Sequence, residues 1–74
     1  MTLDLFFVQQ DSVRTVLGRI AADLGLAARV TARRTTTMEI FPVHVATVEF
    51  DADAAAQAAA KSWFDARGIH WIAR

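Results

Sequence analysis

The chain has 74 residues with eight basic and eight acidic side chains, so its formal net charge at pH 7 is zero. Hydrophobic residues make up 54% of it and charged residues 22%, a composition typical of folded globular proteins rather than disordered ones. We expect one domain over residues 1–74, which excludes a multidomain enzyme. The balanced charge argues against a basic nucleic-acid binder and against an acidic mimic of nucleic acid.

The chain contains no cysteine, so disulfides cannot stabilise it, and this fits a reducing compartment. The apolar run from Leu5 to Val8 is too short for a signal peptide, and no stretch has the length of a transmembrane helix. The sequence therefore predicts a cytoplasmic protein that does not enter a membrane.

The first half of the chain reads as strand, helix and strand. Residues 2–9 alternate in polarity as a strand, with Leu3, Leu5 and Phe7 on one face. Asp11 or Ser12 is expected to cap a helix, and Gly25 to end it. The apolar residues of that helix recur at helical spacing: Val13, Val16, Leu17, Ile20 and Leu24.

Residues 28–36 are β-prone but polar, which suits an edge strand. In a regular strand, Arg29, Thr31, Arg33 and Thr35 lie on one face, and Val30, Ala32, Arg34 and Thr36 on the other. Residues 37–41 are a connection. Pro42 lacks an amide hydrogen and is expected at or before the start of a central strand over residues 43–50.

Asp51 and Asp53 mark the start of a second helix over residues 54–66, since acids suit the positive end of the helix dipole. Gly68 is expected to end that helix, and residues 69–73 form a short last strand. The resulting β-α-β-β-α-β order predicts a ferredoxin-like α+β fold. Both helices then cover one face of a four-stranded antiparallel sheet with strand order 4-1-3-2.

The opposite face of that sheet is expected to stay uncovered and to expose apolar side chains. If Leu3 faces the helices, Phe6 and Val8 lie on the uncovered face. On residues 43–50 either alternating set can face outward, and on the last strand either Trp71 or Ile72 does so. Contiguous exposed apolar surface often marks an interface, and scattered exposure is the ordinary alternative.

Side chains with catalytic or binding chemistry are few. His44 and His70, with Asp4 between their strands, are a weak candidate for a His/Asp group, because no spacing motif supports them. Arg29, Arg33 and Arg34 form a basic cluster that can hold phosphate or a partner's carboxylates, or can be a solvated edge. We expect no catalytic activity, no cofactor and no metal site.

The order and length of the elements resemble an ACT-like regulatory domain, most closely over residues 11–17, which read Asp-Ser-Val-Arg-Thr-Val-Leu. ACT domains typically carry an Asp and, three residues later, a Gly, where the backbone meets an amino-acid effector. In this sequence Asp11 matches the Asp, and Arg14 stands at the Gly position. The resemblance implies a module that dimerises and senses a small ligand.

A looser, class-level resemblance is to small phage-encoded anti-CRISPR proteins, some of which are compact α/β domains that bind a subunit of a CRISPR effector complex. It implies a stoichiometric inhibitor of a bacterial nucleic-acid-processing complex, and we favour this hypothesis over the ACT-like sensor and over an enzyme. Direct nucleic-acid binding is disfavoured, and self-association through the uncovered face stays open. The expected partner contacts are Phe6, Val8, Arg29, Arg33, Arg34, Glu39, Phe41 and Trp71.

Overall fold

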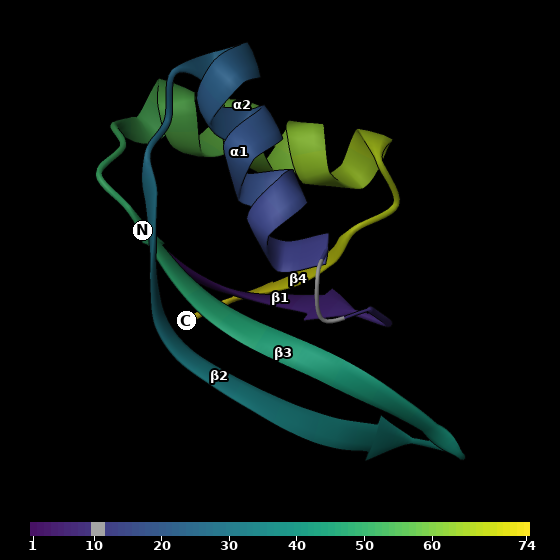
Figure 1. Ribbon diagram of the computed structural model, residues 1–74. Helices are drawn as coiled ribbons and strands as arrows, with labels where there is room; N and C mark the ends of the chain where they lie inside the picture. Colours follow the sequence, from purple (N-terminus) through teal and green to yellow (C-terminus); the bar gives the residue numbers. More distant parts are fainter. Residues whose placement is uncertain (10–11) are drawn as a thin grey trace.

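The computed structural model describes residues 1–9 and 12–74 as a four-stranded sheet with two helices (Figure 1). The elements are β1 (Thr2–Phe7), α1 (Ser12–Leu24), β2 (Ala28–Met38), β3 (Phe41–Phe50), α2 (Ala54–Ala66) and β4 (His70–Ala73). The sheet order is β2-β3-β1-β4 and every pair is antiparallel. This arrangement is the ferredoxin-like fold, and it confirms the predicted element order and strand order.

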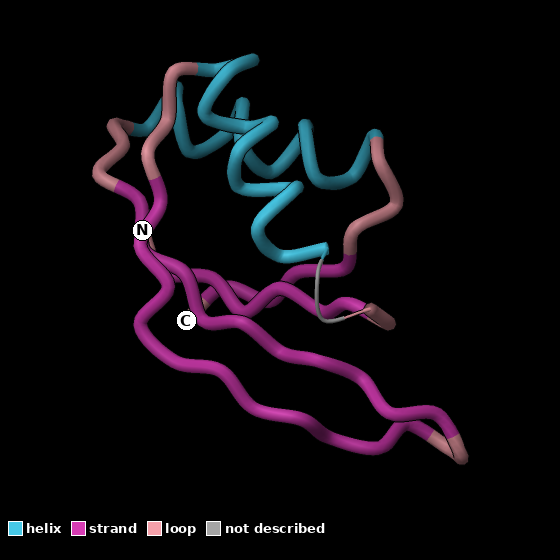
Figure 2. Tube along the Cα trace, viewed as in Figure 1, coloured by secondary structure: helices cyan, strands magenta, loops and turns pink. Residues whose placement is uncertain are grey.

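Both helices lie on the same side of the sheet, and the core fills the space between these layers (Figures 1 and 2). As predicted, Leu3, Leu5 and Phe7 of β1 face the helices and are buried. Phe50 of β3 packs near Phe64 of α2, with ring centroids 6.2 Å apart. The remaining buried members of this core are Val13, Ile20, Ala46, Val48, Ala60 and Trp63.

The helix ends follow the signals in the sequence. The Asp53 side chain caps α2, because its Oδ1 accepts a 2.8 Å hydrogen bond from the amide of Ala56. Gly25 after α1 and Gly68 after α2 take positive φ values of 67° and 69°. Ser12 is the first helical residue of α1, and the predicted cap at Asp11 lies outside the described residues.

A polar contact joins the two helices. Asp23 near the end of α1 accepts a hydrogen bond from Trp63 Nε1 at 2.9 Å and pairs with Arg67 Nη2 at 3.1 Å. The Arg67 guanidinium also lies over the Trp63 ring, 3.8 Å from its centroid. The indole of Trp63 therefore contributes apolar bulk to the core while its N–H keeps an acceptor.

The β2–β3 hairpin is longer and tighter than predicted. β2 continues to Met38, so the expected connection over residues 37–41 shrinks to a two-residue turn at Glu39 and Ile40. Pro42 lies inside β3 rather than before it. This is tolerated because β1 ends at Phe7, opposite His44, so residues 41–43 pair with β2 alone and need no amide hydrogen on their other side.

Candidate interaction surface

The sheet face turned away from the helices, called the open face below, is defined by the strand register, because cross-strand partners share a face. β3 contributes Val43, Val45, Thr47 and Glu49 to it, which decides between the two sets that the sequence allowed. On β4 the outward residue is Ile72, not Trp71. The other open-face residues include Asp4, Phe6, Arg29, Arg34, Thr36 and His70.

A buried carboxylate lies at the centre of the open face. Asp4 is only 6% exposed, and its Oδ1 accepts a 2.6 Å hydrogen bond from the hydroxyl of Thr47, its partner across β1 and β3. Arg34 lies 3.6 Å from Asp4 Oδ2, and Arg74 lies 3.6 Å from Oδ1. Two half-exposed guanidiniums and one hydroxyl thus compensate the buried charge.

The sequence analysis did not predict this Asp4 group, although two polar residues in apolar strands indicate it. Asp4 interrupts the apolar strand Leu3–Phe7, and Thr47 interrupts the apolar strand Val43–Val48. A polar residue in each of two central strands predicts a cross-strand pair once the register is known. Nothing in the sequence indicated that Arg74 pairs with Asp4. That contact arises because the chain continues past β4 beside Thr2, whose carbonyl accepts a hydrogen bond from the Arg74 amide at 2.9 Å.

The apolar part of the open face is smaller than the sequence suggested. Val43 and Val45 lie on it but are 7% and 1% exposed. The register places Phe6 and Arg34 on either side of Val45, and such long side chains can cover a valine. Phe6 is half-buried and its ring centroid lies 5.0 Å from that of His70. Ile72, at the β4 edge, is 49% exposed.

The strongest apolar exposure lies at the turn of the hairpin. Figure 2 shows the β2–β3 hairpin reaching well beyond the layer covered by the helices. The turn and the first residue of β3, residues 39–41, are called the hairpin tip below, and in it Ile40 is 83% exposed and Phe41 59% exposed. Glu39 takes a positive φ of 58°, a conformation that is unfavourable for a residue with a Cβ. The predicted contacts Glu39 and Phe41 therefore lie together on a projecting surface.

The three arginines of β2 do not form the single cluster that their sequence positions suggest. A bulge between Val30 and Ala32 shifts the alternation, so that Arg29 and Arg34 share the open face and Arg33 lies on the opposite side. Arg29 pairs with Glu49 at 3.3 Å. Arg33 makes no ion pair with any acid in residues 1–9 and 12–74.

Arg33 borders a shallow cavity of about 340 Å³ on the helix side of the hairpin. Thr35 and His44 also line it, with Thr35 Oγ1 3.4 Å from His44 Nδ1. His44 faces this cavity while His70 lies on the open face, so the two histidines that the sequence grouped with Asp4 are on opposite sides of the sheet. Within the described ranges no three His, Cys, Asp or Glu residues are placed to hold a metal ion.

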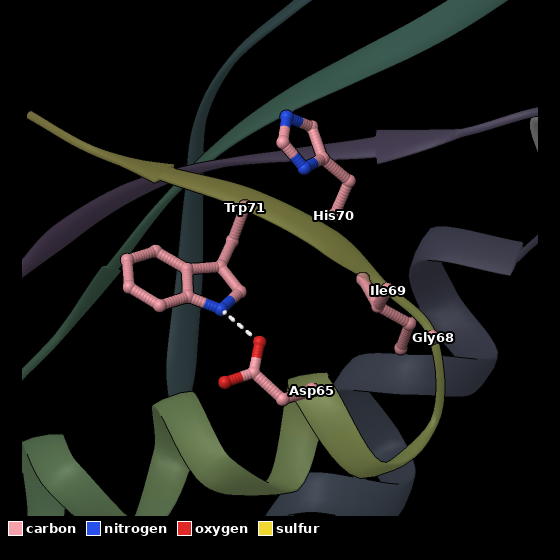
Figure 3. A pocket seen from close by; sticks show the side chains of 5 residues that line it. All are labelled: Asp65, Gly68, Ile69, His70 and Trp71. Atoms are coloured by element: carbon pink, nitrogen blue, oxygen red, sulfur yellow. Dashed lines mark hydrogen bonds between the residues drawn. The ribbon is translucent and has the colours of Figure 1, made fainter.

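Trp71 lies apart from these groups, and Val8 lies just beyond the end of β1. Trp71 is half-buried on the helix side, and its Nε1 donates to Asp65 Oδ1 at 2.9 Å beside a shallow pocket of about 400 Å³ (Figure 3). It is therefore not an open-face residue, and its part in partner contact stays a prediction. Val8 follows β1 and is 74% exposed.

The sequence matches no known family model, and no curated protein shows significant similarity to it. None of the helices in residues 1–9 and 12–74 combines the length and the apolar character needed to cross a membrane.

Proposed function

We propose that the chain is a non-catalytic binding protein that acts by protein–protein contact, through its open face and its β2–β3 hairpin. The observation that carries this proposal is the hairpin tip. Ile40 and Phe41 expose large apolar side chains in and beside the turn of this hairpin. Glu39 beside them takes the positive φ that two-residue hairpin turns require at their first position, so the turn holds both side chains at the end of the hairpin.

The hairpin tip and the open face carry residue types that are common at protein interfaces, namely Phe41, Phe6 and Arg34. Aromatic residues and arginine are enriched at protein–protein contacts and dominate their energetics. Phe41 by its register lies on the same side as the open face, in line with Phe6 and Arg34. A partner laid along this side would cover the tip and the open face together, while Arg29 and Arg34 met its polar rim.

The specific proposal is inhibition of a cytoplasmic bacterial nucleic-acid-processing complex, in the manner of a phage or mobile-element anti-CRISPR protein. The open face carries both signs of charge, with Arg29 beside Glu49 and Arg34 beside Asp4. These acids lower the attraction of the open face for a phosphate backbone, and a neutral chain does not imitate DNA over its whole surface. The inhibitor would therefore act by occluding a protein surface.

The test mixes the purified chain with purified bacterial CRISPR effector complexes and measures complex formation by gel filtration with light scattering, then nucleic-acid cleavage. We expect a stoichiometric complex with reduced cleavage. Changing both Ile40→Ser and Phe41→Ser should weaken it at least about tenfold. Leu24→Ser, at a residue 37% exposed on α1, is the matched control and should leave binding unchanged.

Two results would reject the proposal. One is the absence of any complex that depends on the hairpin tip. The other is a dimer of the chain that forms or tightens when free amino acids are added, which is the behaviour of the rival ACT-like sensor. The same light-scattering measurement, made with and without amino acids, reports that second result directly.

A further inference from the structure

The outer edge of β2 is free to pair with another strand. β2 is the terminal strand of the sheet, and within residues 1–9 and 12–74 it pairs only with β3. It has 11 residues, and residues 31–37 are exposed throughout. Such an edge presents backbone N–H and C=O groups at alternate residues, which is a template for an added strand. The bulge lies near its start, so residues 32–38 remain regular.

The charge on this edge selects the strand that can be added. The sequence of β2 contains three arginines, Arg29, Arg33 and Arg34, and no acidic residue. Two copies pairing through residues 32–38 would place Arg33 and Arg34 of each copy along one seam, and like charges across strands are destabilising. An acidic strand would instead be attracted to these arginines. Arg33, which has no acid partner within residues 1–9 and 12–74, gains one.

We propose that β2 binds an extended acidic segment of the partner protein by strand addition. This inference rests on the proposed function, and it names the chemistry of the partner. Neighbouring residues of a strand point to opposite faces. Acids at two consecutive positions would therefore lie one beside Arg33 and one beside Arg34, and they would fix the register of the added strand. Arg34 would then share its guanidinium between the new acid and Asp4.

The test uses the full chain and a synthetic eight-residue peptide of alternating threonine and valine with two consecutive glutamates at its centre. Amide hydrogen exchange is measured by NMR with and without the peptide at about 1 mM, a concentration suited to weak peptide binding. We expect exchange to slow about tenfold at alternate residues of β2 between positions 32 and 38, because their amides acquire acceptors. The protection should weaken as salt is added.

Two controls test whether the charges of the peptide and of the β2 edge determine binding. The same peptide with two lysines in place of the glutamates should not protect β2. In the chain, Arg33→Glu should weaken binding of the acidic peptide about tenfold, since an attractive pair becomes a repulsive one. Arg19→Glu, which reverses an exposed arginine on α1, should leave it unchanged.

The inference is overturned if the acidic peptide gives no protection on β2, if the lysine peptide protects it equally, or if Arg33→Glu and Arg19→Glu behave alike. Pairing of β2 with β2 in a dimer would overturn it as well. These failures leave the proposed function standing, because a partner can still bind through Ile40 and Phe41. Failure of the proposed function instead appears as loss of the complex that depends on those two residues.

Discussion

Asp4 and Thr47 face each other across the two central strands, and the hydroxyl of Thr47 donates to the Asp4 carboxylate at 2.6 Å. Both side chains are buried, at 6% and 5% exposure, although they lie on the sheet face that no helix covers. A buried carboxylate is tolerated only with hydrogen bonds and opposite charge around it. The centre of the open face is therefore a compensated polar group, with its apolar residues arranged around it.

The first prediction tests that hydrogen bond. Thr47→Val keeps the shape of the side chain but removes the hydroxyl, so the Asp4 carboxylate loses a donor in a buried position. We expect the free energy of unfolding to fall by about 1–2 kcal/mol. Chemical denaturation monitored by tryptophan fluorescence measures it.

Thr36→Val is the control for this prediction, since Thr36 lies on the same face but is exposed. A substitution at such a site should change the stability by less than about 0.5 kcal/mol. Equal losses for the two variants would show that the Thr47 hydroxyl contributes nothing particular to the stability of the fold.

The second prediction separates two neighbouring arginines. Arg34→Glu places a carboxylate where a guanidinium now lies 3.6 Å from buried Asp4, so we expect a loss of about 1–3 kcal/mol in the free energy of unfolding. Arg33→Glu, on the other side of the strand, should stay within about 0.5 kcal/mol of the unchanged chain. Thermal unfolding of the two single variants at low salt measures the difference.

Comparable losses in both variants would contradict the assignment of the two arginines to opposite faces. The comparison also decides how partner binding is tested. A double reversal of Arg33 and Arg34 would also lower the stability of the fold through Arg34, so a loss of binding would not isolate the charge of the edge. Arg33→Glu by itself changes the charge of the edge while leaving the Asp4 group intact.

The sequence predicted the element order and the strand order because strong local signals bounded each element. Asp53 at a helix start and Gly25 and Gly68 at the helix ends are such signals, and each took the predicted role. The polar second strand and the apolar third strand then occupied the edge and the centre of the sheet. Composition alone carries that information, since burial on two faces requires apolar residues on both.

The faces within the sheet could not be predicted in the same way. One extra residue at the bulge between Val30 and Ala32 moved Arg33 away from Arg29 and placed Arg34 beside Asp4. No residue of β2 is of a type that predicts a bulge at this position. Trp71 likewise faces the helices because it pairs with Leu5 of β1, a register that alternation along β4 alone does not contain.

The third prediction concerns a glycine within α1. Gly18 lies in the helix interior, and a Cβ added there meets no atom within 4 Å, so Gly18→Ala should stabilise the protein by about 1 kcal/mol through helix propensity. For a domain of this size the melting temperature should rise by roughly 4–8 °C.

Gly25→Ala is the matched control. It also has open space, but its φ of 67° disfavours a side chain, so its melting temperature should fall by a similar amount. If both variants moved the melting temperature in the same direction, α1 would not end at Leu24 with Gly25 in the left-handed conformation. Differential scanning calorimetry on the two variants measures the shifts.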